Sequence, residues 1–423
     1  MIPSPTDYQA ALAQCAQCGA CTAVCPVYRV TGRESLTARG RLHLLARLND
    51  PEALGELLSR CLLCGNCKRT CPRGIDLVSL TVSARAEWGK KGGPSVLAGF
   101  LARQALAHPA LAAALAKAAK PLGLAAELPM DSGLRLKLTG TVSPLPALDA
   151  SLNGGAPPIR SPRRPALYFP GCLATHLYPE IGPATARIIA HLDDFRLLTP
   201  DDLSCCGLAA QSAGDLDQAR TLACRNLARF ASLGGEEEAT APIITTCASC
   251  YAALKGYPGL LADDPVWRPA AEAFASRVWE LSAFILAHGS RLTPGFREAS
   301  PVRTVVYHDP CHLRPTITRQ PRQLLDLAPG LRRLELPHGV QCCGQGGLFR
   351  LAHPRLSLAI RKPLIEDFLT TGAELAVSSC SGCLLQWQQG LKASPAQVTH
   401  LALLLDSQLA NAIPEQDLRR HHD

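Results

Sequence analysis

Two short cysteine runs constrain this chain more than any other feature of its sequence. The first, CAQCGACTAVCP, occupies residues 15–26, and the second, CLLCGNCKRTCP, occupies residues 61–72. In each run three cysteines are separated by two residues, a fourth follows after three more, and a proline comes next. Three thiolates at this spacing can converge on three irons of a cube, while the fourth reaches a second cluster. The runs therefore predict a pair of 4Fe-4S clusters.

The fourth cysteine of each run is predicted to serve the cluster of the other run. One predicted ligand set is Cys15, Cys18, Cys21 and Cys71, and the other is Cys61, Cys64, Cys67 and Cys25. A zinc site would usually take four ligands in two pairs, without a third close thiolate. Between the runs, Leu and Arg recur at helical spacing and Pro51 suits the start of a further helix, so helices are expected to join the two halves.

The remaining composition favours metal ligands over disulfides. The chain has 423 residues, 19 of them cysteine, and 47% of it is hydrophobic, so a core can form without disulfides. The N-terminus MIPSPTDYQA has neither the basic segment nor the apolar run of a secretory signal. A reducing cytoplasm is therefore expected, with peripheral association at the inner face of the membrane left open.

The sequence disfavours both a transmembrane helix and nucleic-acid binding. The most apolar stretch is interrupted by residues such as Arg103, Pro109 and Lys117, which a transmembrane helix would bury at high cost. The formal charge of +8 is modest for the length and lacks interleaved aromatic residues, so no nucleic-acid binding is expected.

The second half of the chain repeats itself. An Ala/Leu-rich and then Pro/Gly/Ser-rich stretch, residues 91–163, is expected to be a helical linker. Beyond it, ALYFPGC, LSCCG and ITTCASC return as VVYHDPC, VQCCG and VSSCSGC, an internal duplication of about 135 residues. The first unit contributes Cys172, Cys205, Cys206, Cys247 and Cys250, and the second contributes Cys311, Cys342, Cys343, Cys380 and Cys383. The expected domains are residues 1–90, the linker 91–163, and two units at 164–292 and 293–423.

Each cysteine segment of the repeat follows a short β-branched or aromatic run, and helical stretches follow or intervene. The order strand, cysteine loop, helix brings loops together at the carboxyl ends of parallel strands. The five cysteines of each unit are thus expected to converge on one metal site. Gly207 and Gly344, after each cysteine pair, would let the backbone turn close to a cluster.

Several residues near these motifs have open roles. Cys224 is the one cysteine outside the pattern, and a small buried residue of a helix is expected there. His308 and His312 bracket Cys311, where they would tune a cluster, handle protons, or simply be hydrogen-bonded in a loop. Arg314 and Arg350 are interpreted as surface charge. No catalytic residue is identified.

Residues 8–90 resemble the two-cluster bacterial ferredoxin module in its helical form. The repeat resembles the cysteine-rich CCG domain of heterodisulfide reductases and of the glycolate oxidase iron-sulfur subunit. The resemblance implies an α+β multidomain fold, with a helical two-cluster ferredoxin module followed by two repeated α/β cysteine-rich (CCG) domains. In the heterodisulfide reductase branch of these relatives, five such cysteines bind a non-cubane 4Fe-4S cluster, and in other relatives a site holds a different cluster or zinc. Because both units keep all five positions, one or two further clusters, or zinc, are expected.

The module order resembles the glycolate oxidase iron-sulfur subunit along nearly the whole chain, including the connector GRESLTARGRL. The long Ala/Pro linker departs from that family. No Gly-x-Gly-x-x-Gly follows a predicted strand, so the chain is not expected to bind flavin or nicotinamide itself. The leading hypothesis is an electron-transfer subunit of a glycolate or lactate dehydrogenase complex, which receives electrons from a flavoprotein carrying FAD and passes them to quinone or another acceptor.

Two other hypotheses stay open. The first is a catalytic disulfide reductase that cleaves a disulfide at a CCG cluster, since one of the heterodisulfide reductase proteins, the D polypeptide, resembles this chain in module order. The second is a zinc-stabilised interaction protein, which would require a different interpretation of the N-terminal cysteine runs.

Overall fold

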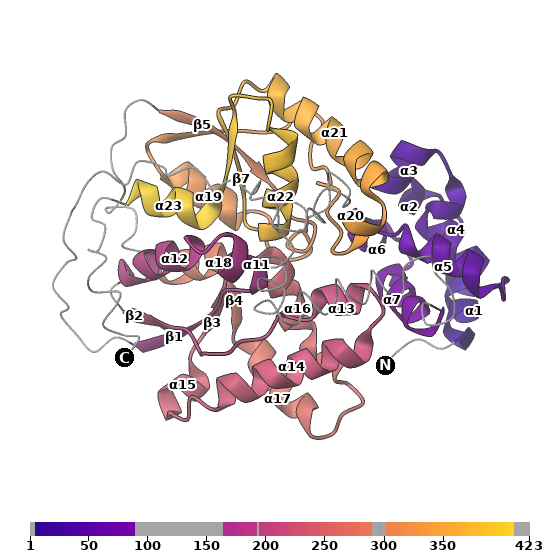
Figure 1. The fold of residues 1–423 in the computed structure, drawn as a ribbon, viewed down its shortest axis with the longest axis horizontal. Helices are drawn as coiled ribbons and strands as arrows, with labels where there is room; N and C mark the ends of the chain where they lie inside the picture. The colour runs from indigo at the N-terminus through magenta and orange to yellow at the C-terminus, as the bar shows by residue number, and fades with distance from the viewer. Residues whose placement is uncertain (1–4, 89–163, 193, 290–295, 297–301, 410–423) are drawn as a thin grey trace, which may run out of the picture.

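The structure is a computed structural model that describes residues 5–88, 164–192, 194–289, 296 and 302–409. It has a helical N-terminal module and two α/β units, which Figure 1 shows as an indigo group of helices beside two sheet-containing bodies. This architecture confirms the predicted fold class. The predicted linker, residues 91–163, lies outside the described residues.

The N-terminal module contains short helices that hold the two cysteine runs. Its elements are α1 (Pro5–Gln14), α2 (Ala20–Ala23), α3 (Pro26–Thr31), the 3-10 turn η1 (Glu34–Leu36), α4 (Ala38–Leu45), α5 (Pro51–Ser59), α6 (Asn66–Thr70) and α7 (Leu77–Trp88). Helix α5 begins where predicted, because Pro51 is its first residue and the Asp50 carboxylate accepts hydrogen bonds from the N–H groups of Glu52 and Ala53. In the connector, Gly40 packs against the carbonyl of Glu34, where a side chain would not fit.

The first α/β unit is a four-stranded parallel sheet in the order β2-β1-β3-β4. Its strands are β1 (Arg164–Phe169), β2 (Phe195–Leu198), β3 (Ile243–Thr245) and β4 (Val278–Glu280). Its helices are α11 (Cys172–Leu177), α12 (Ile181–Ala190), α13 (Leu208–Ser212), α14 (Leu216–Ala231), α15 (Glu236–Thr240), α16 (Ala248–Leu260), α17 (Trp267–Ser276) and α18 (Leu281–His288).

The second unit repeats this topology in the order β6-β5-β7-β8, again all parallel. Its strands are β5 (Arg303–His308), β6 (Leu331–Leu334), β7 (Leu375–Ser378) and β8 (Gln397–His400). Its helices are α19 (Gln320–Leu327), α20 (Phe349–Ala352), α21 (Pro354–Thr370), α22 (Ser381–Gly390) and α23 (Leu401–Gln408). The central strands β1, β3, β5 and β7 are largely or wholly buried, as parallel sheets covered on both faces require.

The two units meet at the carboxyl ends of their sheets. The N–H of Ala248, just after β3, donates to the carbonyl of Ser379, just after β7, at 2.8 Å. The ring nitrogen Nε2 of His400, at the end of β8, lies 3.0 Å from the carbonyl of Thr246. On the flank, Arg187 forms a salt bridge of 2.6 Å with Asp406. The loops that carry the cysteines of both units therefore face one another.

The glycine-rich segment GQGG, residues 344–347, joins all three parts of the molecule. A Cβ on Gly346 would lie 2.5 Å from the Leu62 side chain of the N-terminal module, and one on Gly347 would lie 2.9 Å from the Ser212 hydroxyl of the first unit. Gly344 itself approaches the Ser357 carbonyl within the second unit. All three glycines have positive φ. This segment therefore serves close packing between modules.

No helix among the described residues combines the length and apolar character needed to cross a membrane.

Candidate iron-sulfur sites

The first predicted ligand set gathers around one small cavity. Its wall includes Cys15, Cys18, Cys21 and Cys71, so the fourth cysteine of the second run lies with the first three of the first run. Arg39 lies on the same wall and donates through Nη1 to the Gln17 carbonyl at 2.5 Å. That these thiols hold a cluster in common stays a prediction.

Both cysteine runs use the same unusual backbone. Gln17 and Leu63, each directly before the second cysteine of its run, have φ of 53° and 54°. Gly19 and Gly65, each directly after that cysteine, have φ of 79° and 71°. Left-handed non-glycine residues are uncommon, so their occurrence at matched positions marks two equivalent tight loops. The glycines were visible in the sequence, whereas nothing in the identity of Gln17 or Leu63 predicts this conformation.

The second predicted ligand set lies in a less polar environment. Burial, followed by the charges of neighbouring thiols, raises the pKa of Cys64 to about 12 and raises that of Cys67 further. Burial also raises the pKa of Cys25, which precedes α3. In the metal-free protein these thiols are protonated at neutral pH, so metal binding must release protons.

Two arginines, Arg41 and the partly buried Arg85, position the second run, and sequence reasoning did not identify them. Arg85 donates to the carbonyls of Leu58 and Cys61, at 2.7 Å and 2.6 Å, and burial lowers the pKa of its guanidinium to about 10. Arg41, only 3% exposed, donates to the Arg60 carbonyl at 2.9 Å. These cations fix the end of α5, and Arg85 lies within electrostatic range of the Cys61 thiol that follows it.

In the first α/β unit the five predicted cysteines converge at the carboxyl edge of the sheet. Cys172 begins α11, Cys247 precedes α16, and Cys250 lies in the first turn of α16. The Cys172 thiol lies 3.7 Å from the sulfur of Cys205, and Cys205 and Cys206 are both buried. Gly207, after the pair, has φ of 85°, as the turn predicted there requires.

Hydrogen bonds among these thiols lower the pKa of some and raise the pKa of others. Hydrogen bonds from Cys250 and Cys380 hold the pKa of the Cys247 thiol below its ordinary value. The hydrogen bond with Cys206, and then that with Cys247, raises the pKa of Cys250. The site thus favours a partial negative charge that a cation would neutralise.

In the second unit, contacts between sulfurs join four of the five predicted cysteines. The sulfurs of Cys343 and Cys383 are 3.1 Å apart, Cys342 contacts Cys343, and Cys380 contacts Cys383. Cys311 is the exception, because among the described residues no hydrogen bond joins its thiol to another cysteine of its unit. Its thiol lies within electrostatic range of Cys342 and Cys343 in its own unit and also of Cys64 in the N-terminal module.

The thiol sites of the two units adjoin each other. Cys247 of the first unit and Cys380 of the second are hydrogen-bonded. The Ser249 hydroxyl lies 3.4 Å from the Cys380 sulfur and 3.2 Å from Nδ1 of His312. His312 therefore lies between the sites, and burial lowers its pKa.

An open cleft of about 630 Å³ lies beside the second thiol set of the N-terminal module and reaches Cys342 of the second unit. Five arginines line it, and we call it the arginine cleft: Arg29, Arg69, Arg314, Arg319 and Arg322. The one carboxylate of its wall, Asp309, is held by both terminal nitrogens of Arg322 at 2.7 Å. The cleft therefore has a positive wall that favours anionic groups.

Two expectations for individual residues were wrong. Arg350 is only 3% exposed, so it is a buried residue of α20 rather than a surface charge. Arg314 is half-buried, and it donates to the carbonyls of Asp309 and Gln341 and to the Asn66 side chain. It thus ties the second unit to the loop of the second cysteine run. Cys224 lies in α14, where it is partly buried against the core.

The donor sets suit iron-sulfur chemistry better than they suit isolated thiols. Sulfur atoms lie in contact in both units, and the buried Arg41 lies at the start of the second run. Thiolates that ionise at such distances repel one another unless a metal neutralises them. Cysteine thiolates are the usual ligands of iron-sulfur clusters.

Known families match all three parts of the chain. A model of the 4Fe-4S dicluster domain matches residues 11–75, and a model of the cysteine-rich domain matches residues 166–255 and 305–388.

Among curated proteins, the probable glycolate oxidase iron-sulfur subunit of Bacillus subtilis is 27% identical, covering 93% of each chain. Lactate utilization protein A of an Exiguobacterium species is 30% identical, covering 58% of this chain and 98% of that protein. The D polypeptide of the dihydromethanophenazine:CoB–CoM heterodisulfide reductase of Methanosarcina acetivorans is 26% identical, covering 90% of each. The chain is therefore an iron-sulfur protein that belongs to the family of the glycolate oxidase iron-sulfur subunit and lactate utilization protein A.

Proposed function

We propose that this chain is the iron-sulfur electron-transfer subunit of a flavin-dependent 2-hydroxy-acid dehydrogenase complex acting on glycolate or lactate. A partner flavoprotein carrying FAD would oxidise the acid, and electrons would leave through this chain for quinone or another acceptor. The relatives named glycolate oxidase iron-sulfur subunit and lactate utilization protein A support this substrate class. Iron-sulfur clusters carry single electrons and accept no hydride, so a flavin partner is required.

One observation carries the proposal: the four thiol sets adjoin one another in a row. Cys21 of the first set lies within electrostatic range of Cys67 in the second. Cys64 of the second set has the same relation to Cys311 and Cys342 of the second unit. Cys380 of the second unit is hydrogen-bonded to Cys247 of the first. A continuous series of sites suits conduction better than it suits a single catalytic centre.

A second candidate, a reductase of small disulfides, is favoured by the arginine cleft. The cleft opens to solvent, reaches Cys342, and has a volume suited to a small molecule. An anionic disulfide could therefore approach the second unit. The relative that is named as a heterodisulfide reductase protein also supports this candidate.

Stopped-flow absorbance of the iron-sulfur band distinguishes the two candidates. The anaerobically purified chain, mixed with its copurified flavoprotein and glycolate or lactate, should be reduced. The chain and the acid without the flavoprotein are the control and should show no change. Rapid reoxidation of the reduced chain by a disulfide, with no response to any flavoprotein and hydroxy acid, would assign the protein to the reductase class.

A further inference from the structure

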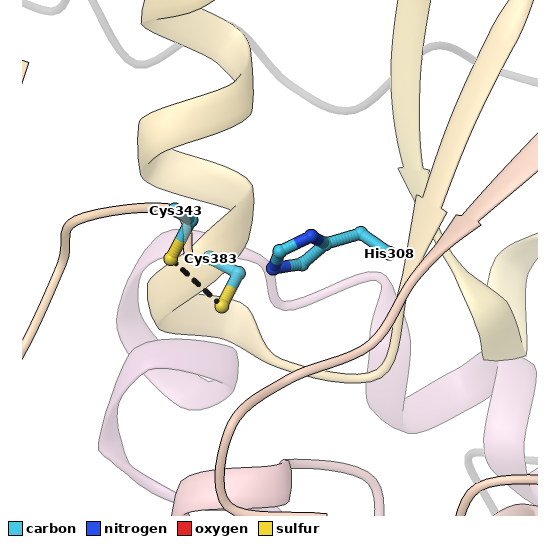
Figure 2. A group of neighbouring side chains, drawn as sticks. All are labelled: His308, Cys343 and Cys383. Atoms are coloured by element: carbon cyan, nitrogen blue, oxygen red, sulfur yellow. Dashed lines mark hydrogen bonds between the residues drawn. The ribbon is translucent and has the colours of Figure 1, made fainter. Parts of the chain in front are cut away.

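A buried histidine belongs to the thiol site of the second unit. A ring nitrogen of His308 and the sulfurs of Cys343 and Cys383 all lie within 4.8 Å of one another. The three residues are 2%, 5% and 4% exposed. Figure 2 shows the imidazole at the end of β5 pointing toward the two sulfurs, which come from the loop after β6 and from α22.

The duplication supplies an internal comparison for this position. His308 pairs with Ser378 in the sheet of the second unit, and Phe169 pairs with Thr245 in the first. Both lie three residues before the first cysteine of their units. Phe169 is fully buried and stacks on Phe230 with ring centroids 6.5 Å apart, so it offers no donor atom. The imidazole is therefore specific to the second site.

The first cysteine also differs between the two units: Cys172 contacts another thiol of its unit, whereas Cys311 makes no such hydrogen bond within the part of the chain that the structure describes. In the first unit Gly171, with φ of 79°, lets the chain pass the Cys250 sulfur and brings Cys172 to 3.7 Å from Cys205. The second unit has Pro310 at this position, and proline cannot adopt a positive φ. Cys311 accordingly makes no hydrogen bond to a thiol of its own unit among the described residues. In the second site, as far as the structure describes it, the first cysteine is thus not hydrogen-bonded to a thiol of its unit, and a ring nitrogen lies near the sulfurs.

Packing fixes the orientation of the imidazole. The His308 ring meets the Trp387 indole edge-on, with centroids 5.5 Å apart and an interplanar angle of 70°. Trp387 is fully buried in α22, the helix that carries Cys383. The His308 carbonyl accepts a hydrogen bond from the Ser378 hydroxyl. The ring is thus held at the site by the same element that supplies one of its thiols.

We propose that His308 is a nitrogen ligand of the metal centre in the second unit, where it acts with Cys343 and Cys383. This inference rests on the assignment of a metal site to each unit. The first unit would then hold its centre through sulfur alone, and the second through a mixed nitrogen and sulfur set. An imidazole is neutral where a thiolate is anionic, so histidine ligation raises the reduction potential of an iron-sulfur centre. Mixed sets of this kind also suit zinc.

The test compares full-length wild-type protein with His308→Phe, which gives the second unit the residue of the first, and with the reciprocal Phe169→His. Iron and zinc are counted by mass spectrometry. Nitrogen ligation is read by electron-nuclear double resonance for iron and by K-edge absorption for zinc. His312→Asn is the matched control, because that ring also lies near Cys343. Circular dichroism and the spectrum of the N-terminal clusters check that each variant folds.

Wild type and His312→Asn should show directly bound nitrogen, which His308→Phe should lose together with part of its metal. An all-sulfur second centre in wild type, a second unit without metal, or a nitrogen signal that survives His308→Phe would each overturn the proposal. So would a signal lost only in His312→Asn. None of these readings depends on a flavoprotein, so an all-sulfur centre would leave the electron-transfer proposal intact, and failed reduction by a flavoprotein would leave His308 ligation intact.

Discussion

Gly171 and Pro310 occupy the same position in the two units, but only glycine can adopt the positive φ that the first unit has there. Gly171 adopts a φ of 79° directly before Cys172, and a Cβ at this position would lie 2.6 Å from the Cys250 sulfur. Real Cβ atoms do not approach a sulfur so closely, and a positive φ strains every residue except glycine. The first thiol site therefore depends on the absence of a side chain.

Gly171→Ala should weaken metal binding in the first unit and leave the other sites loaded. With φ of 79° and ψ of 152°, Gly171 lies in a backbone region that essentially only glycine occupies, which alone costs another residue about 1–3 kcal/mol, and the clash with Cys250 adds to this cost. Gly32→Ala controls for a positive φ without a clash, since Gly32 has φ of 65° but nothing within 4 Å of the position that a Cβ would take. Thermal unfolding should show some loss of stability in both variants, larger in Gly171→Ala, and metal analysis should show metal loss only in Gly171→Ala. Equal metal loss in the two would contradict the steric explanation.

Glu280 and His400 also occupy matched positions, at the ends of β4 and β8, where both cap the next helix. Glu280 is 1% exposed, and its Oε1 atom has no hydrogen-bond partner among the described residues. Burial raises the pKa of this carboxyl to about 7. The unfolded chain ionises near the ordinary value of about 4.3, so its ionisation opposes folding above that pH.

Between pH 5 and pH 8, the Glu280→Gln variant should lose less folding stability than the wild-type protein does. The carboxyl favours folding fully below its unfolded pKa, and this contribution declines as pH rises to about 7. The change is on the order of 3 kcal/mol. Midpoints of thermal unfolding from pH 5 to 8 should fall less steeply in the variant. The exposed control Glu52→Gln should keep the wild-type slope, and parallel slopes for all three proteins would exclude a role of Glu280.

Among the secondary-structure elements, the central strands were easier to predict than the edges. Strands β1, β3, β5 and β7 lie where buried apolar runs precede a cysteine, so their position followed from the sequence. Strand β6, LRRL, is partly exposed and carries arginines, so its composition did not indicate a strand. The cysteine sets followed from local spacing, but contacts such as Arg85 with Cys61, or Cys247 with Cys380, join distant segments and leave no local pattern.

Cys71, directly after α6, and Cys25, directly before α3, are the residues on which the predicted crossed ligation of the two cysteine runs depends. Cys71→Ser should remove the cluster held mainly by Cys15, Cys18 and Cys21, because Cys71 lies on the wall of their cavity. Cys25→Ser is the matched variant and should remove the other cluster. Iron content and low-temperature electron paramagnetic resonance of the reduced protein would separate the two signals. Loss of the same signal in both variants, or damage by Cys71→Ser to the second cluster alone, would contradict crossed ligation.

At the scale of the whole molecule, the spatial order of the thiol sets differs from their order in the chain. The N-terminal module approaches the second unit through Cys64 and Cys311, although the first unit follows it in sequence. The glycines of residues 344–347 permit this arrangement, because Gly346 packs on Leu62 and Gly347 on Ser212. Only after the three parts have assembled do the sites form a row.

Cys206→Ser should remove metal from the first unit and preserve the spectrum of the second, and Cys343→Ser should do the reverse. Each cysteine is buried among the thiols of its own unit, and neither is the residue that crosses the interface. Metal counting and visible spectra of the two variants check this. If either substitution abolishes both signals, the two units share a single site.

The hydrogen bond between Cys247 and Cys380 has a magnetic consequence. Centres bound through sulfurs in contact cannot have independent electron spins whenever both are paramagnetic. Their spectrum would then differ from the sum of the spectra of the two single-site variants, through line broadening, splitting or faster spin relaxation. The two units of the internal duplication, which are about 135 residues apart in the chain, would then behave in a magnetic field as one coupled spin system.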